Sequence, residues 1–303
     1  MAPVIEELRL AFRPPLWPDS LFGHLVATGV PGVEEWRDGA LRRTLRLPGG
    51  PGVVALTPGP DHVACRLQVA DPADVPVAVA ACRRLLDLDA DPDAAGAALG
   101  ADAALAPLVA DSPGRRIPGT VDPAEMALRI VLGQQVSVAA AGTLAARLAV
   151  AAGEPVDDPG GGLGRLFPTP AAVAAVDPAV LAMPASRRTT VLTLARALAD
   201  GTVDLRPGAD PAAALAALRE LPGIGPWTVA MVAMRALGDT DAFPATDLGV
   251  RLAAQAHGLP ATPAALRARA ERWRPWRAYA VQYLWGSADH AVNRLPVTPP
   301  PAG

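Results

Sequence analysis

Residues 221–247 read LPGIGPWTVAMVAMRALGDTDAFPATD, and this stretch decides the fold. Gly223 and Gly225 lack a Cβ, so their backbone can take positive φ or approach a ligand closely. Pro226 suits the first turn of a helix, whose free N–H groups bind anions such as phosphate. Before the glycines, DPAAALAALRE predicts a helix capped by Asp210. The stretch predicts a helix, a tight hairpin and a second helix, although a bare Gly-x-Gly also occurs in ordinary helix connections.

The composition limits the class of protein. The chain has 303 residues, enough for two domains, and 51% of them are apolar, yet no apolar run is long enough for a membrane span. The N-terminal MAPVIEELRLAFRPP has charges where a signal peptide has an apolar core, so we expect no export. Two cysteines, Cys65 and Cys82, cannot form a disulfide scaffold, a four-cysteine zinc site or a cysteine-ligated iron–sulfur cluster. We expect both cysteines to be small buried apolar residues. We expect the protein to work in the reducing cytoplasm.

The charged residues are unusual in type and distribution. All 27 basic residues are arginine. The absence of lysine excludes a Walker-type phosphate loop and lysine Schiff-base chemistry. The formal net charge is −3, but residues 85–111 hold six aspartates and no base, whereas eight arginines face five acids from 221 onward. Since arginines gather at 267–277, we expect that end of the molecule to face a polyanion.

The first part of the chain predicts an α+β domain. Residues 4–70 include four strand-type runs, VIEELRLAF, TLRLP, GVVALTP and HVACRLQVA, separated by Pro and Gly turns. Segments 20–29 and 75–88 have helical periodicity. The economical arrangement packs these helices on one side of a small antiparallel sheet. We therefore expect an α+β N-terminal domain over residues 1–112.

The second part predicts an all-α domain. Residues 111–123, DSPGRRIPGTVDP, have the Pro/Gly punctuation of a linker. Beyond them, helical periodicity dominates, with a break near 133–137, so we expect an all-α domain over residues 113–296. We expect flexibility in the Gly-rich loop 153–164 and in the tail 297–303. The later predicted helices span about 170–183, 185–200, 211–220, 226–237, 247–257, 262–273 and 275–289.

Leu-Pro-Gly-Ile-Gly resembles the helix–hairpin–helix motif, and the residues after it sharpen the resemblance. Trp227 follows the motif, and Asp247 stands twenty residues beyond Trp227. Together they resemble the helix–hairpin–helix DNA glycosylase superfamily, within it the bacterial 3-methyladenine DNA glycosylase II, or AlkA-type, branch. Segments beginning LRLAFRPPLW, RIPGTVDPAEM, FPTPAAVAA and ERWRPWRAYA look like corresponding parts of that branch. The resemblance covers nearly the whole chain and implies a TBP-like half-domain followed by a helical glycosylase domain.

The resemblance implies a monofunctional glycosylase that flips alkylated, 3-methyladenine-like bases from duplex DNA and hydrolyses the N-glycosidic bond. Asp247 is the implied catalytic residue, stabilising positive charge on the sugar and orienting water. From its sequence position it could instead cap the next helix, with Thr246 sharing that role. Trp227 stands where bifunctional members carry the Schiff-base lysine, although it could be a core residue. We expect a monomer in the cytoplasm, at the nucleoid.

The base pocket implied by the resemblance departs from the branch pattern. Trp285 matches a pocket tryptophan and joins Trp227. His24 stands where the branch often has another aromatic, and Met231 and Leu248 replace tyrosines. Electron-rich rings favour cationic alkylated purines. The preferred lesion therefore stays open, and deaminated purines, oxidised purines and uracil are alternatives. A protein that binds DNA without catalysis is a further alternative.

The remaining candidates concern DNA and ions. The resemblance implies that Gln135 holds the wedge position that fills the hole left by the flipped base, with Gln134 adjacent, although the pair could be a polar helix kink. The four histidines, His24, His62, His257 and His290, lack metal-ligand spacing, so we expect no catalytic metal. The residues expected to hold phosphate are Gly223, Ile224, Gly225, Trp227, Thr228 and the arginines of 267–277. The carbonyls expected to hold a structural Na⁺ or K⁺ belong to Arg219, Leu221 and Ile224.

Overall fold

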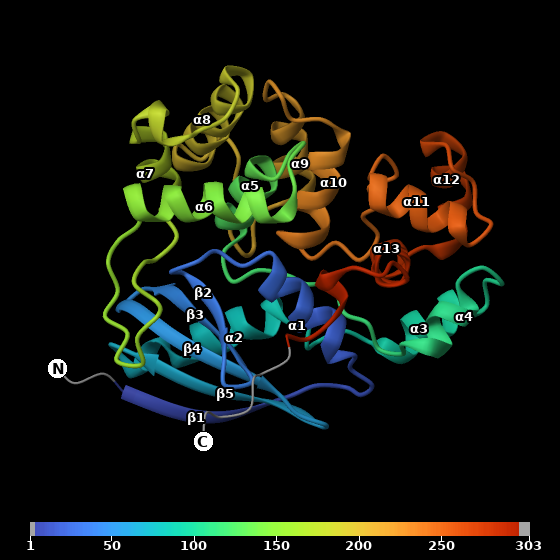
Figure 1. Ribbon diagram of the computed structural model, residues 1–303, viewed down its shortest axis with the longest axis horizontal. Coiled ribbons are helices and arrows are strands. Elements are labelled where there is room, and N and C mark those ends of the chain that lie inside the picture. Colours follow the sequence, from blue (N-terminus) through green and yellow to red (C-terminus); the bar gives the residue numbers. More distant parts are fainter. Residues whose placement is uncertain (1–3, 297–303) are drawn as a thin grey trace.

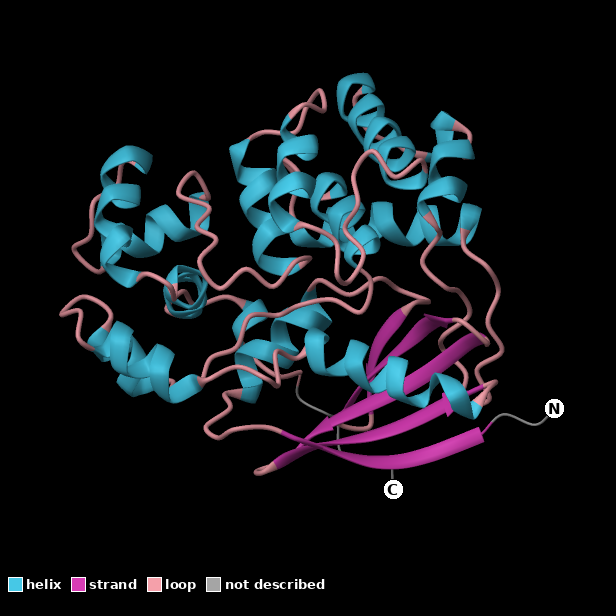
Figure 2. Cartoon of the chain, turned by 180° about the vertical axis from the view of Figure 1, so that it is seen from behind, coloured by secondary structure: helices cyan, strands magenta, loops and turns pink. Residues whose placement is uncertain are grey.

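A computed structural model of the protein describes residues 4–296. A twisted sheet forms one layer, and most helices lie above it as a second layer (Figures 1 and 2). The predicted tail at 297–303 lies outside the described residues. Within the described range, no helix combines the length and apolarity that crossing a membrane requires.

The sheet is antiparallel, with strand order β1-β5-β4-β3-β2. In β5, alternate side chains are buried, from Val63 through Cys65 and Leu67 to Val69, as in a sheet with one face on a core. The strands are β1 (Val4–Ala11), β2 (Glu34–Arg37), β3 (Ala40–Leu47), β4 (Gly50–Pro58) and β5 (His62–Val69).

Strand β2 was not predicted, although the sequence contains its signal. Asp38 and Gly39, at φ +52° and +77°, form the two-residue turn between β2 and β3. Asp-Gly favours such hairpins because both residues accept positive φ. The EEWR run of β2 lacks apolar alternation, so only this turn marked it.

Helices α1 (Pro18–Ala27) and α2 (Val75–Leu85) complete the N-terminal core. Leu21 and Phe22 of α1 and Cys82 of α2 share one apolar cluster with the buried strand residues, including Cys65. Both cysteines are free and buried, as predicted. The predicted α+β architecture is confirmed.

The chain after residue 122 is mainly helical, and several of its helices begin in the same way. Asp122, Thr169, Asp210 and Thr262 each accept a backbone N–H of the next helix, and a proline follows each one. The all-α prediction is confirmed for this part, except that the expected helix 170–183 is a short helix followed by a 3₁₀ turn. The helices are α5 (Pro123–Leu132), α6 (Val138–Ala152), α7 (Pro170–Ala175), α8 (Ala185–Ala199), α9 (Pro211–Arg219), α10 (Pro226–Arg235), α11 (Leu248–Ala256), α12 (Pro263–Ala270) and α13 (Arg277–Gly286), with 3₁₀ turns at Pro72–Asp74, Pro178–Val180, Glu271–Trp273 and Ala291–Asn293.

Two helices that were not predicted, α3 (Pro92–Gly100) and α4 (Ala106–Asp111), lie beside α13 (Figure 1). Leu99 and Leu105 belong to the core of the helical layer. Asp102 Oδ2 accepts the Trp273 indole N–H at 2.7 Å. The aspartate-rich segment thus packs with the helical part, and the domain boundary at 112–113 stays a prediction.

Two segments expected to be loose are packed. In the expected linker 111–123, Arg116 is buried and donates to the carbonyls of Arg13 and Asp87. A Cβ on Gly119 in the same segment would lie 2.2 Å from a backbone oxygen. The Gly-rich loop 153–164 is held against the sheet, because Arg42 pairs with Asp158 at 2.6 Å. Both segments are anchored by arginines.

A buried ionic network joins the sheet to α5. Arg43 on β3 pairs with Glu34 on β2 at 2.7 Å and with Glu125 at 3.0 Å. Arg129 pairs with the same two carboxylates, Glu34 at 3.0 Å and Glu125 at 2.6 Å. The network holds two acids and two bases, so its charges balance.

Candidate active site

The predicted hairpin links α9 to α10. Asp210 caps α9, accepting the Ala212 N–H at 2.9 Å. Gly223 has φ +82°, and a Cβ there would lie 2.0 Å from Oγ1 of Thr190 on α8. Both the backbone angle and the packing therefore require glycine at this position.

Gly225 has a different role from the one predicted. Its φ of −94° and ψ of 176° are extended, so the expectation of positive φ is wrong for this residue. A Cβ on Gly225 would meet no atom within 4 Å. Among the described residues, no side chain caps the N-terminus of α10, whose first N–H groups therefore lie uncapped beside open space.

These two glycines are expected to respond differently to substitution. Gly223→Ala should lower the free energy of unfolding by more than about 1 kcal/mol, through the clash with Thr190 and the positive φ. Gly225→Val should stay folded but bind abasic-site duplex DNA more weakly, because its side chain would occupy the space a phosphate approaches. Urea unfolding and fluorescence anisotropy at several salt concentrations measure the two effects. Unchanged affinity of Gly225→Val at every salt concentration would remove the hairpin as the anchor.

Asp247 is held by three donors. Its Oδ1 accepts the Val250 N–H at 2.9 Å and the Trp285 indole N–H at 3.0 Å. Its Oδ2 accepts the Trp227 indole N–H at 2.9 Å. The capping interpretation of Asp247 is thus correct, and the two indoles in addition orient the carboxylate between α10, α11 and α13. A carboxylate offers about four lone-pair positions, so one remains for a further partner.

An imidazole from the N-terminal domain covers Trp285. The rings of His24 on α1 and Trp285 are stacked, with centroids 6.2 Å apart and an interplanar angle of 24°. The His24 Nε2 is buried without a hydrogen-bond partner among the described residues. Burial, followed by the nearby Arg235 and Arg129, holds the pKa of His24 well below its ordinary value, so the imidazole is neutral at neutral pH. The sequence-predicted pair His24 and Trp285 is brought together.

Gly249 is a site residue that sequence reasoning missed. A Cβ there would lie 3.2 Å from Asp247 Oδ1 and 3.3 Å from Trp285 Nε1. Glycine therefore lets the indole approach the carboxylate. Gly249 follows Asp247 by two residues in the sequence. The need for glycine there depends on Trp285 of α13, a contact that the sequence does not show.

Met231 and Leu248 lie differently. Met231 is 7% exposed and lines a cavity one helical turn beyond Trp227. Leu248 is 64% exposed at the start of α11, directly after Asp247, so its place in the pocket wall stays a prediction.

Gln134 and Gln135 are adjacent in the turn between α5 and α6, but their side chains have different surroundings. Gln134 Nε2 donates to Thr228 Oγ1 at 2.8 Å and to the Gly223 carbonyl at 3.3 Å, so it braces the hairpin. Gln135 is exposed and has φ +57°, a strained angle for a residue with a side chain. Of the two glutamines, Gln135 is the exposed one, and its role as the wedge stays a prediction.

Comparison with known proteins gives the family. Residues 7–122 match the family described as the AlkA N-terminal domain. DNA-3-methyladenine glycosylase 2 of Escherichia coli is 36% identical over 283 residues, covering 91% of this chain and 95% of that protein. The chain belongs to the AlkA family.

One further relative and one solved structure are also similar to this chain. The probable bifunctional transcriptional activator/DNA repair enzyme AlkA of Mycobacterium tuberculosis is 55% identical over 289 residues, covering 95% of this chain. This chain spans 58% of the length of that mycobacterial protein. The solved 3-methyladenine DNA-glycosylase from Archaeoglobus fulgidus has a TM-score of 0.78 at 21% identity, covering 92% of this chain and 97% of that one. It shares the fold, as an AlkA-family chain should.

The arginines at 267–277, expected on phosphates, are mostly engaged within this AlkA-family chain. Arg269 pairs with Asp102, and its guanidinium lies 5.5 Å from the Trp273 ring centroid. Arg274 and Arg277 both pair with Asp241 and Glu271. These three arginines are therefore paired within the chain, and their contact with phosphate stays a prediction. Among described residues, Arg267 and Arg272 have no ion pair.

The proposed cation carbonyls lie at the end of α9 and in the hairpin. The Leu221 carbonyl accepts the Ile224 N–H at 3.1 Å. A carbonyl oxygen has a second lone pair, so this bond alone does not prevent Arg219, Leu221 and Ile224 from binding Na⁺ or K⁺. The cation stays a prediction. Within residues 4–296, no group of three or more His, Cys, Asp or Glu side chains could hold a metal.

Proposed function

We propose that this chain is a monofunctional DNA glycosylase that removes alkylated, 3-methyladenine-like bases from duplex DNA. It extrudes the damaged base, hydrolyses the N-glycosidic bond and leaves an abasic site for base excision repair. The Escherichia coli relative, named DNA-3-methyladenine glycosylase 2, supports this substrate class.

The observation that carries the proposal is the Asp247 carboxylate, oriented by the Trp227 and Trp285 indoles. Breaking the N-glycosidic bond develops positive charge at C1′ of the sugar, as in glycoside hydrolysis. A fixed anion at about 4 Å, in an effective dielectric near 20, is worth on the order of 4 kcal/mol. That corresponds to about a thousandfold in rate.

The remaining lone-pair position of Asp247 suits the attacking water. The water oxygen bonds to C1′ as the glycosidic electron pair leaves with the base. The water passes one proton to the carboxylate, and the cationic alkylated base becomes neutral as it takes the glycosidic electron pair. No lysine takes part, because the chain has none.

The surrounding residues have roles that follow from their positions. Trp285, backed by His24, offers a ring face to the extruded base. Gln135, exposed on the strained turn, fills the space that the base leaves in the duplex. The open N-terminus of α10 holds a backbone phosphate. Because no step needs a second subunit, we infer a monomer acting at the nucleoid.

A panel of duplexes tests the substrate class. Separate duplexes carry 3-methyladenine, hypoxanthine, 8-oxoguanine or uracil, and single-turnover base release is measured for each. We expect fastest release of 3-methyladenine. Fastest release of a deaminated or oxidised base would show that the enzyme acts on that class of lesion instead. DNA binding without base release from any duplex would show that the protein binds DNA but is not a glycosylase.

The monofunctional mechanism predicts an intact strand after base removal. A bifunctional glycosylase forms a lysine imine that eliminates phosphate, whereas Trp227 stands at that position here and lysine is absent. We expect strand cleavage only after alkali, and no protein–DNA adduct on borohydride reduction. A borohydride adduct that maps to the helical domain would refute the mechanism.

A further inference from the structure

The turn between α5 and α6 spans residues 133–137 and is strained at its centre. Gln135 has φ +57° and an exposed side chain. A residue with a Cβ stays in this conformation only where the surrounding structure fixes it. The contacts that hold the turn therefore also hold the direction in which the Gln135 side chain leaves it.

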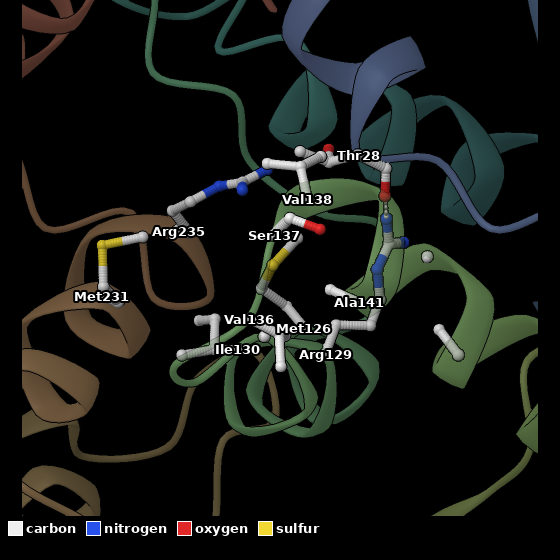
Figure 3. A pocket seen from close by; sticks show the side chains of 13 residues that line it. Thr28, Met126, Arg129, Ile130, Val136, Ser137, Val138, Ala141, Met231 and Arg235 are labelled. Carbon is white, nitrogen blue, oxygen red and sulfur yellow. Dashed lines mark hydrogen bonds between the residues drawn. The ribbon is translucent and has the colours of Figure 1, made fainter. Parts of the chain in front are cut away.

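Packing against the turn is incomplete on one side. A cavity of about 150 Å³ lies there, and Val136, Ser137 and Val138 are among the residues that line it. Figure 3 shows Val136 and Ser137 at one side of this space, with Met231 and Arg235 of α10 across from them. Side chains that line a cavity lack protein contacts on that side, unlike those in a close-packed core. The turn therefore depends more on hydrogen bonds to neighbouring elements.

Hydrogen bonds hold both ends of the turn. Nη2 of Arg187 on α8 donates to the carbonyl of Leu132 at 2.8 Å. Leu132 is the last residue of α5, so its carbonyl has no partner within the helix. At the other end, Ser137 Oγ accepts the Ala140 N–H at 3.2 Å and caps α6. These bonds fix where the turn begins and ends, and the strained residue lies between them.

Gln134 ties the middle of the turn to the hairpin. A glutamine amide has two N–H donors. Nε2 of Gln134 donates to Thr228 Oγ1 at 2.8 Å and to the Gly223 carbonyl at 3.3 Å. Thr228 is 2% exposed, and Gly223 is the hairpin residue whose positive φ and close packing require glycine. Both acceptors therefore belong to a rigid part of the fold.

The hairpin end of this connection lies next to the candidate catalytic group. Thr228 follows Trp227 in α10, and the Trp227 indole N–H donates to Asp247 at 2.9 Å. A short series of contacts through Gln134 therefore joins the exposed Gln135 to the hairpin and to the carboxylate. The three features come from segments far apart in the chain.

We propose that Gln134 is a positioning residue for base extrusion, which holds the strained turn against the hairpin so that Gln135 enters the duplex at a fixed place. This inference rests on the proposed function. Extrusion costs the pairing and stacking energy of the base, and it costs less when the base has no partner. A side chain already held in place loses less conformational freedom when it enters the duplex. Gln134 therefore contributes to the extrusion step rather than to hydrolysis.

Two duplexes isolate the extrusion step. One carries 3-methyladenine opposite thymine, and the other carries it opposite a tetrahydrofuran abasic analogue, which forms no base pair. Single-turnover base release is measured on both at saturating enzyme. Gln134→Met removes both donors at similar length, and we expect it to slow release about tenfold from the paired duplex, the combined effect of two neutral hydrogen bonds, but about twofold or less from the unpaired one.

The ratio of the two rates separates positioning from folding. It does not depend on the fraction of folded enzyme, so a destabilised protein leaves it unchanged. Gln68→Met, on β5, should change neither rate, because Gln68 lies on the sheet face opposite the buried side chains of that strand. Thr228→Val removes the shorter hydrogen bond from the other side and should also slow only the paired duplex, which provides a second variant if Gln134→Met does not fold.

A double-variant cycle tests whether Gln134 acts through Gln135. Gln135→Ala removes the projecting side chain, so Gln134→Met should slow the paired duplex no further in its presence. Independent effects of the two substitutions, equal slowing of both duplexes by Gln134→Met, or a wild-type rate of that variant on the paired duplex would overturn the inference. Release from neither duplex by the wild-type protein would instead refute the proposed function.

Discussion

Asp247→Asn is expected to slow base release by two to three orders of magnitude while duplex binding persists. The substitution removes the negative charge opposite the sugar cation, which is worth on the order of 4 kcal/mol at about 4 Å. Single-turnover release of 3-methyladenine measures the rate, and anisotropy on abasic-site DNA measures binding. Release near the wild-type rate would show that Asp247 is only a helix cap.

The hydrogen bonds of Asp247 call for a second variant. Asparagine has one oxygen and one NH₂ group, yet both carboxylate oxygens accept indole N–H groups in the native site. Asp247→Asn therefore also sets an NH₂ against an indole. Trp227→Phe removes one indole donor and leaves the charge. The double variant Asp247→Asn/Trp227→Phe separates the two causes. If a misoriented residue 247 causes the defect, the double variant recovers activity. If the lost charge causes it, the double variant stays slow. Thr246→Ala, at the exposed neighbour, serves as the control.

Glu125→Gln is expected to lower the free energy of unfolding by about 3–5 kcal/mol, the usual cost of removing one partner from a buried ion pair. Glu125 accepts from both Arg43 and Arg129, and all three side chains are shielded from solvent. Without this carboxylate, one of the two guanidinium charges in the network is uncompensated. Urea unfolding measures the loss as a lower midpoint at an unchanged slope.

Asp61→Asn provides the matched control for that measurement. Asp61 pairs with Arg9 at 3.3 Å, and the two side chains are 69% and 68% exposed. Solvent screens such a pair, so its removal should leave the unfolding midpoint nearly unchanged. Equal effects of Glu125→Gln and Asp61→Asn would show that the buried network does not hold the sheet and α5 together.

The candidate site was predictable as a set of residues but not as an arrangement. The hairpin spacing marked Gly223 and Asp247, and resemblance to the glycosylases marked Trp227, Trp285 and His24. Sequence reasoning could not show that both indoles bind the same carboxylate.

The sequence by itself determined the features with local causes. Aspartate or threonine before proline marks the start of several helices, and alternating apolar residues mark β5. The two glycines at 223 and 225 predicted the tight turn, and Gly223 has the positive φ. These signals act through φ restrictions and hydrogen bonds within a few residues, so no distant segment is needed to recognise them.

Tertiary structure alone decided which charges and rings meet. Arg269 and Arg277 looked available for DNA until Asp102 and Asp241 were found beside them. Gly225 looked like a left-handed turn residue until its extended backbone appeared. Contacts between segments far apart in the chain depend on how whole helices and strands pack, and that packing minimises exposed apolar surface and unpaired buried charge for the entire molecule. No short stretch of sequence contains that information.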